Sequence, residues 1–327
     1  MKTAIVTGGA GFIGSHMSEL LLKEGFHVTA IDSMVNGQDD NVTLFKDHKQ
    51  YAFHRLDLAR DKFETLFRGA QYVFHMAALA DIVPSIEHPL AYHDSNVTAT
   101  VRVLEASRKH HVKKFIYSAS SSCYGIPDRY PTPESADIRP EYPYALTKFL
   151  GEQYALHWQK IYGLPVISLR YFNVYGTRAR TNNTYGAVFK VFLSQKLHGK
   201  PLTIVGDGKQ TRDFIYVTDV VRANLAAAES KCAAEIFNIG TGKPQSVNRL
   251  AELIGGGREY IPKRPGEPDS THADIAKVQK LLDWRPAVSF EEGVKIMLEN
   301  IDYWKDAPLW DRKSIAKATE KWFDCLS

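Results

Sequence analysis

The length, composition and charge of the chain exclude several classes of protein. Its 327 residues are 44% hydrophobic and 24% charged, which is ordinary for a globular protein and long enough for two closely joined domains. The net charge of +4 comes without a long basic run, the three cysteines and twelve histidines lack metal-ligand spacing, and no apolar run approaches the ~20 residues of a membrane span. We therefore expect no nucleic acid, no metal, no disulfide framework and no membrane.

The stretch TGGAGFIGSH, residues 7–16, joins the first predicted strand (3–7) to a helix. Its glycines Gly8, Gly11 and Gly14 lack Cβ atoms, so backbone N–H groups and the positive end of the helix can approach a pyrophosphate closely. This turn therefore predicts a dinucleotide site. Because the strand begins at residue 3, it leaves no room for a signal peptide, and we expect a cytoplasmic protein.

The second predicted strand, 28–32, ends in an acid, Asp32. A carboxylate at this place accepts hydrogen bonds from the adenosine ribose hydroxyls and repels a 2′-phosphate, which favours NAD over NADP. Further strands at 72–75, 114–118 and 165–170 alternate with helical patterns. Such alternation predicts a doubly wound α/β fold, in which helices cover both faces of a parallel sheet.

Two stretches carry groups suited to acid–base chemistry. SASSSCYG, residues 118–125, places hydroxyls, Ser120 among them, directly after a strand, where open α/β sheets bind their ligands. In YPYALTK, a helix beginning at Pro143 would bring Tyr144 and Lys148 onto one face. The lysine and an oxidised nicotinamide would lower the pKa of the phenol, making tyrosinate a usable base. The alternative is a Ser-rich turn and an amphipathic helix in which the pair occurs by chance.

Beyond residue 175 the pattern changes to short segments separated by glycines, which indicates a second region. The segment 255–268, GGGREYIPKRPGEP, is dense in glycine and proline, and we interpret it as a loop over a site. Aromatic residues between Trp304 and Phe323 predict a packed terminal pair of helices.

These motifs together resemble those of one enzyme family. TGGAGFIG, HMAA (75–78), SASSSCYG, YALTK, RYFNVYG (170–176), GDGKQTRDFIYV (206–217) and RPGEP are similar, over nearly the whole chain, to the extended short-chain dehydrogenase/reductases of the NAD-dependent nucleotide-sugar epimerase/dehydratase family. The resemblance implies a Rossmann-type NAD-binding domain over 1–172, with a later contribution from about 213–240. It also implies a smaller C-terminal α/β domain over 173–327 that mainly binds a nucleotide sugar.

The resemblance assigns residues to the site as well. Ser120, Tyr144 and Lys148 match the catalytic trio of the family. Positions that line NAD are matched by Gly8, Gly11, Phe12, Ile13, Gly14, Asp32, Asn36, Asp57, Leu58, Ala77, Ala78, Asn96, Ser118, Tyr144, Lys148 and Tyr171. Positions that contact the nucleotide sugar are matched by Ser120, Ser121, Ser122, Tyr144, Asn173, Arg212, Arg264, Glu267 and Thr271.

Three of the charged or titratable side chains have alternative interpretations. The planar fork of arginine suits phosphate oxygens, but Arg212 could instead pair with its neighbour Asp213, and Arg264 could be a solvated loop charge. His75 stands at the end of a buried strand, and we interpret it as a packed histidine rather than a catalytic one.

Within this family the two residues after the catalytic hydroxyl distinguish the reactions. Dehydratases carry an Asp-Glu pair there, which removes the C5 proton and protonates the departing C6 hydroxyl. Here the places hold Ser121 and Ser122, whose hydroxyls titrate too far from neutral pH to act alone as acid or base. A 4-epimerase needs neither group, because the 4-keto sugar only rotates before hydride returns to its other face. The resemblance therefore favours a UDP-hexose 4-epimerase.

Other functions stay open at this point. A nucleotide-sugar 4,6-dehydratase or a UDP-glucuronate decarboxylase/4-epimerase of the same family could recruit acids from elsewhere, such as Glu134 or Asp128. A non-catalytic NAD-binding regulator could use the same fold, because fold alone does not guarantee activity.

The resemblance extends to substrate range and assembly. In family epimerases a bulky residue at the position of Thr271 restricts the C2 substituent of the sugar. The modest size of Thr271 leads us to expect UDP-GlcNAc and UDP-GalNAc as substrates beside UDP-Glc and UDP-Gal. The family usually forms homodimers through a four-helix bundle, here the helix after Asn96 and the helix carrying Tyr144. The outer positions of that second helix are Phe149, Tyr154, His157 and Trp158.

Overall fold

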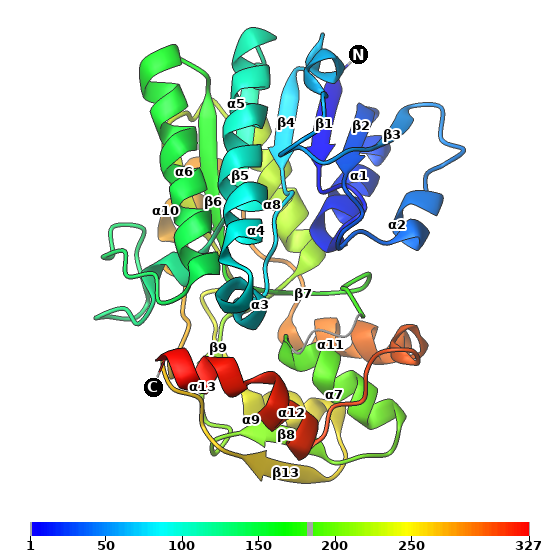
Figure 1. Ribbon diagram of the computed structural model, residues 1–327, viewed down its shortest axis with the longest axis vertical. Helices are drawn as coiled ribbons and strands as arrows, with labels where there is room; N and C mark the ends of the chain where they lie inside the picture. Colours follow the sequence, from blue (N-terminus) through cyan, green and yellow to red (C-terminus); the bar gives the residue numbers. More distant parts are fainter. Residues whose placement is uncertain (1, 182–185, 327) are drawn as a thin grey trace.

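The computed structural model describes residues 2–181 and 186–326, which form two lobes (Figure 1). The chain passes between the lobes several times, so neither lobe is one continuous segment. Within the described residues, no helix is long and apolar enough to cross a membrane.

A seven-stranded sheet forms the centre of the first lobe. The strands are β1 (Thr3–Thr7), β2 (His27–Asp32), β3 (Tyr51–Arg55), β4 (Tyr72–His75), β5 (Lys114–Ser120), β6 (Val166–Tyr171) and β11 (Glu235–Ile239). Their order is β11-β6-β5-β4-β1-β2-β3, and all neighbours are parallel. The order reverses beside β1, and ligands of such sheets bind at that switch point, beyond the carboxyl ends of the strands.

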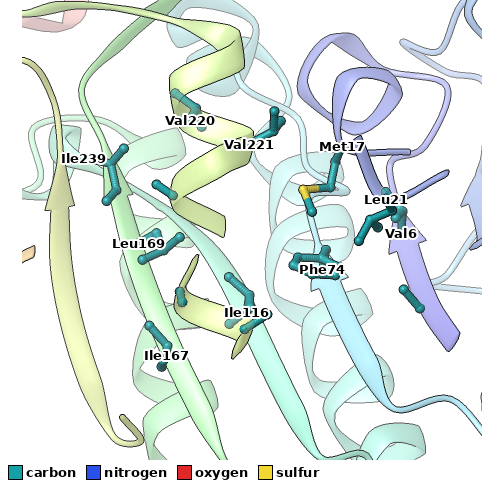
Figure 2. Close-up of a cluster of buried hydrophobic side chains, with 14 of the residues drawn as sticks. Val6, Met17, Leu21, Phe74, Ile116, Ile167, Leu169, Val220, Val221 and Ile239 are labelled. Carbon is teal, nitrogen blue, oxygen red and sulfur yellow. The ribbon is translucent and has the colours of Figure 1, made fainter. Parts of the chain in front are cut away.

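Helices cover both faces of this sheet, as the doubly wound fold requires. One face carries α1 (Phe12–Lys23), α8 (Val217–Glu229) and α10 (Ala276–Leu282), and the other carries α5 (Ala99–Lys109) and α6 (Pro143–Tyr162). Figure 2 shows the core on the first face, where Met17 and Leu21 of α1 and Val220 of α8 meet strand residues such as Phe74 and Leu169. Short helices α2 (Asp39–Thr43), α3 (Ile82–Glu87) and α4 (Pro89–His93) lie in the connections.

The second lobe is smaller and has its own core, with Trp304, Phe192 and Leu250 among its buried side chains. Its helices are α7 (Val188–Leu197), α9 (Val247–Ile254), α11 (Phe290–Glu299), α12 (Arg312–Ala318) and α13 (Glu320–Leu326). Its strands form three pairs: β8 (Leu202–Val205) with β13 (Arg258–Ile261), β7 (Asn173–Tyr175) with β10 (Phe214–Tyr216), and β9 (Thr211–Arg212) with β12 (Gln245–Ser246).

The structure confirms the predicted fold class and the five predicted strands. It also confirms a helix that begins at Pro143 and a terminal helix pair, α12 and α13. The interpretation of 255–268 as a loop was wrong for its middle part, because Arg258–Ile261 pairs with β8 as strand β13. The helix α10 packs in the first lobe, although its residues fall in the predicted C-terminal domain.

Candidate active site

A cavity of about 720 Å³ lies at the switch point of the sheet and is lined by residues from both lobes. The turn after β1, the ends of β2 and β5, and the start of α6 contribute from the first lobe. The segments around Asn173, Arg212 and Arg264 contribute from the second region predicted by the sequence. Most of the predicted cofactor residues and all of the predicted nucleotide-sugar residues therefore line one cavity.

The glycine turn after β1 can exist only without side chains. Gly8 has a φ of +70°, and a Cβ on Gly14 would lie 2.0 Å from the carbonyl oxygen of Gly8. The N–H of Gly11 donates to that same carbonyl at 3.0 Å. With no side chains in the way, the N-terminus of α1 faces the cavity through Phe12 and Ile13, an arrangement that suits a pyrophosphate.

The adenosine end of the predicted cofactor site also lies on the cavity. Asp32 ends β2, is 8% exposed, and accepts hydrogen bonds from the N–H groups of Ala10 (3.0 Å) and Met34 (2.8 Å). Burial raises the pKa of this carboxyl despite those bonds. The other predicted residues here, Asn36, Asp57 and Leu58, line the same part of the cavity.

The structure separates the remaining predicted cofactor residues into two groups. Ala77, Ala78 and Tyr171 line the cavity, whereas Asn96, Ser118 and Lys148 do not. The Asn96 amide is occupied by the N–H of Leu79 (2.8 Å), the carbonyl of Leu79 (3.0 Å) and the Thr147 hydroxyl (3.0 Å). The Ser118 hydroxyl lies 3.0 Å from that of Tyr171.

The side chains of Asn96 and Ser118 thus have partners within the protein, and their contact with the cofactor stays a prediction. Asn96 fixes the segment that carries Ala77 and Ala78, and Ser118 fixes the phenol of Tyr171.

The predicted catalytic hydroxyls meet at the end of β5. The Ser120 hydroxyl lies 2.7 Å from that of Ser122, and Tyr144, in the first turn of α6, lines the same cavity. Burial raises the pKa of Tyr144, Ser120 opposes this, and the negative charge of Asp81 adds to the rise.

Lys148 lies one helical turn beyond Tyr144, with its Nζ 4.6 Å from the centre of the Tyr117 ring. Burial lowers the pKa of this ammonium to about 7, and the nearby Glu152 carboxylate opposes the change. The expected lowering of the pKa of Tyr144 by Lys148 is thus absent from the protein alone, because burial disfavours both charges. Among the described residues none accepts a hydrogen bond from Lys148 Nζ, which fits an ammonium that binds the hydroxyls of a ribose.

The side of the cavity opposite the glycine turn carries two arginines and one acid. Glu267 accepts a hydrogen bond from Arg212 at 2.7 Å and lies 3.8 Å from Arg264. The alternative pairing of Arg212 with Asp213 was wrong, because Asp213 is buried and accepts from the N–H groups of Thr241, Gly242 and Ala273. The guanidinium groups of Arg212 and Arg264 both lie beside this carboxylate, and guanidinium groups suit anionic ligands.

Thr271 and Asn173 complete this side. The Thr271 hydroxyl donates to Asn173 Oδ1 at 2.7 Å and accepts from the N–H of Asp213 at 3.0 Å. Both residues line the cavity, as do Ser121 and Ser122. A threonine held in this way projects no large group toward the sugar.

The acids named for a competing reaction lie elsewhere. Asp128 is exposed and pairs with Arg139 at 2.7 Å, and Glu134 accepts from the N–H of Asn238 at 2.9 Å; neither lines the cavity. His75 is buried between the hydroxyls of Thr7 (2.7 Å) and Thr100 (2.9 Å), and burial lowers its pKa to about 3. The interpretation of His75 as a packed, neutral histidine is confirmed.

Several side chains that line the cavity were not predicted from the sequence: Asp81, Glu141, Tyr142, Arg180 and Trp322. Asp81 and Arg180 form an ion pair across the cavity wall. Tyr142 stands only two residues before Tyr144, so its proximity was a usable signal. No pattern in the sequence could place Trp322 here, because it reaches the cavity from the last helix of the chain. In the part of the chain that the structure describes, no cluster of His, Cys, Asp or Glu could hold a metal ion.

Comparisons with known proteins agree with this geometry. A profile of the NAD dependent epimerase/dehydratase family matches residues 4–240. The chain is 37% identical over 298 residues to a putative UDP-glucose 4-epimerase of Methanocaldococcus jannaschii, covering 89% of this chain and 95% of that protein.

Solved structures are similar over their whole length. The UDP-N-acetylglucosamine 4-epimerase of Methanobrevibacter ruminantium M1, in complex with UDP-N-acetylmuramic acid, superposes with a TM-score of 0.86 at 35% identity, covering 91% of this chain and 99% of that one. The UDP-glucuronic acid 4-epimerase of Bacillus cereus, in complex with UDP-glucuronic acid and NAD, gives 0.85 at 33% identity, covering 92% and 99%. The family predicted from the motifs is confirmed: this chain belongs to the NAD dependent epimerase/dehydratase family and is an NAD-dependent enzyme of the epimerase type.

Proposed function

We propose that this enzyme interconverts the C4 epimers of a UDP-hexose through a 4-keto intermediate. The observation that carries the proposal is the composition of the catalytic end of the cavity. Tyr144 and Ser120 meet there beside Ser121 and Ser122, and no carboxylate stands directly after Ser120. Such a site can move the proton of a sugar hydroxyl but lacks the neighbouring acid pair of a dehydratase.

We assign the cofactor site by fit. The turn of Gly8, Gly11 and Gly14 would hold the pyrophosphate of NAD, and Asp32 would accept from its adenosine ribose. Lys148 would donate to the nicotinamide ribose. Bound at this place, NAD supplies a hydride acceptor that returns the hydride to the same sugar.

The chain's own residues then handle the proton. Ser120 and Tyr144 bind the C4 hydroxyl, and Tyr144 withdraws its proton. Because burial raises the pKa of Tyr144, the phenolate needs a compensating positive charge. The ammonium of Lys148 is the cation that the same helix supplies.

Arg212 and Arg264 are proposed to bind the diphosphate, with Glu267 near the nucleotide ribose. Both guanidinium groups line the cavity and flank Glu267. The proposed UDP moiety rests on relatives and solved structures named for UDP sugars.

Thr271 supports a wide substrate range. Its side chain is small and is held by Asn173 and the backbone of Asp213, so we propose that an N-acetyl group at C2 is tolerated. UDP-GlcNAc and UDP-GalNAc should be interconverted alongside UDP-Glc and UDP-Gal. The variant Thr271→Tyr should keep the unacetylated pair and lose the acetylated one, and turnover of unacetylated sugars alone by the wild type would refute this range.

We also propose a homodimer through α5 and α6. Tyr154 and Ile161 are exposed apolar residues of α6, at 40% and 54% exposure, and His157 is exposed on the same helix. Phe149 and Trp158 instead pack against cores of the monomer and are less available. Sedimentation equilibrium tests the assembly, and Tyr154→Glu with Ile161→Glu should convert a dimer to a monomer.

The deciding experiment incubates the purified protein with UDP-Glc, UDP-Gal, their N-acetyl counterparts and UDP-glucuronate. Products are followed by mass and NMR. We expect products of unchanged mass that differ at C4. A loss of water or of CO₂ would instead show a dehydratase or a decarboxylase, and the absence of any conversion would contradict the proposed reaction.

A further inference from the structure

A row of aromatic rings runs along one wall of the cavity from the catalytic tyrosine to the substrate side. The rings of Tyr144 and Tyr142 are stacked, with an interplanar angle of 7° and centroids 6.3 Å apart. The Tyr142 ring lies 6.4 Å from that of Trp322, and the guanidinium of Arg264 lies 5.5 Å from the centre of the Trp322 ring. All four residues line the cavity.

Trp322 comes from α13, the last helix of the chain. In Figure 1 this helix lies at the junction of the lobes, where it contacts α3. The Trp322 indole is 6% exposed, and its Nε1–H donates to the carbonyl of Pro265 at 2.8 Å. This bond holds α13 against the segment that carries Arg264 and Glu267.

Tyr142 connects the row to the catalytic hydroxyls in a second way. Burial raises the pKa of both phenols, and Ser122 opposes this rise at Tyr142 as Ser120 does at Tyr144. The hydroxyls of Ser122 and Ser120 lie 2.7 Å apart. A displacement of the Tyr142 ring would therefore disturb the hydroxyl that faces the proposed C4 position. The Trp322 ring packs next to Tyr142, with the two ring centroids 6.4 Å apart.

We propose that Trp322 is a positioning residue for the nucleotide-sugar site, which orients Arg264 toward the diphosphate and holds Tyr142 against Tyr144. The binding of the phosphates by Arg264 and the position of the Tyr144 phenol then both depend on the Trp322 indole. The C-terminal helix is then part of the substrate site and not only a cover of the second lobe. The inference rests on the proposed function for the identity of the diphosphate.

The positioning role of Trp322 has a physical basis: an aromatic face restricts the conformations of the side chains that pack on it. An arginine side chain has many rotamers, and fixing one of them for a ligand costs conformational entropy. The face of an indole attracts a guanidinium and limits those rotamers before the ligand arrives. Stacked aromatic rings likewise favour one relative placement of Tyr142 and Tyr144.

Three variants separate this role from simple packing. Trp322→Leu keeps an apolar side chain but removes the aromatic face, and Trp322→Phe restores an aromatic face without the indole N–H. Cys325→Ala changes an exposed residue of the same helix and serves as the matched control. The affinity for UDP is measured by calorimetry, and kcat and KM are measured with the UDP-hexose that the wild type converts.

We expect Trp322→Leu to weaken UDP binding about fivefold and to lower kcat as well, with bound NAD retained and Tm below that of the wild type. Trp322→Phe should recover most of the loss, and Cys325→Ala should behave as the wild type. In an Arg264→Gln background, Trp322→Leu should weaken UDP binding little further, because the partner it orients is gone.

Equal UDP affinity in Trp322→Leu and the wild type would overturn the proposal, as would full additivity with Arg264→Gln. If Trp322→Leu fails to fold, Trp322→Met, which also lacks an aromatic face, takes its place in the affinity measurement and in the double variant with Arg264→Gln. The UDP measurement needs no turnover. A wild type that binds UDP but converts no UDP-hexose would therefore refute the proposed reaction while leaving the role of Trp322 testable.

Discussion

The two sides of the cavity are built in different ways. The part of the cofactor side proposed to hold the pyrophosphate is one short segment, residues 8–14, in which backbone atoms approach too closely for any side chain on Gly14. The proposed substrate side consists of side chains from distant segments, such as Asn173, Arg212 and Trp322. The pyrophosphate turn requires residues without side chains at its closest contacts, whereas the substrate side is formed by side chains.

The difference teaches what each side can tolerate. Backbone atoms in a tight turn cannot move aside, so a methyl group added in this turn must distort the backbone and destabilise the site. Side chains on the substrate side can adopt other rotamers and can be replaced singly. We therefore expect damage to the cofactor side to be general and damage to the substrate side to be graded.

The largest effect is expected where the two sides meet. Tyr144→Phe should lower kcat by about 10³-fold, because a positioned base contributes on this order, while NAD retention and UDP affinity stay unchanged. Tyr162→Phe removes the hydroxyl of an exposed residue of the same helix and should have no effect. Turnover that survives in Tyr144→Phe would exclude the proposed proton transfer.

On the cofactor side, Gly14→Ala should weaken NAD binding by about 100-fold. Its Cβ would lie 2.0 Å from the Gly8 carbonyl oxygen, so the turn must open. The matched control is Gly163→Ala, where φ is +70° but no atom lies within 4 Å of the added Cβ; it should cost some stability and no NAD affinity. Equal NAD loss in both variants would show that the contrast between the two sides is wrong.

The variant Lys148→Met tests how much the burial of the Lys148 ammonium costs in stability. Because burial lowers the pKa of Lys148 to about 7, protonation is penalised in the folded state. Relative to the variant, the wild type therefore loses stability as pH falls from about 10 to about 7, and loses no more below that.

At pH 7 the nucleotide-free Lys148→Met protein should melt a few degrees above the wild type, and the difference should vanish toward pH 10. Its turnover should nevertheless fall, because stability and activity oppose each other at such sites. Thermal denaturation across pH measures the first effect, with exposed Lys160→Met on the same helix as control. A lower melting temperature at pH 7 would contradict the prediction.

The smallest effect is expected on the substrate side. Arg212→Gln should weaken UDP binding about tenfold, the value of one hydrogen bond to a charged group, with NAD retention unchanged. Lys209→Gln, three residues earlier and exposed, is the control. A loss of NAD in Arg212→Gln would mean that the two sides are not separable.

The sequence predicted the parts of the site that are local in the chain, and it missed side chains that reach the cavity from remote elements. The strand, the turn of Gly8 to Gly14 and the spacing of Tyr144 and Lys148 are local, so their pattern is visible along the chain. Trp322 and Asp81 reach the cavity only through the packing of remote elements. The strand β13 was hidden between glycines and prolines that favour loops.

Asn96 shows a further limit. A resemblance can place a residue near a cofactor, but it cannot say whether the side chain faces the ligand or the backbone beside it. In this structure the amide is used up by Leu79 and Thr147. The carboxylate of Glu267 had a predicted role near the ribose, yet its position between two arginines depends on tertiary packing.

The last strand of the large sheet, β11, comes from residues 235–239, far along the chain from the other six strands. A protein cut after residue 172 would lose this strand together with α8, exposing the backbone edge of β6 and the apolar side chains that Val220 and Phe237 cover. Such a fragment would present an open hydrogen-bonding edge to its neighbours and should aggregate rather than fold. Modular engineering of this enzyme, by exchanging one lobe for that of another protein, must therefore exchange interleaved segments instead of a single half of the chain.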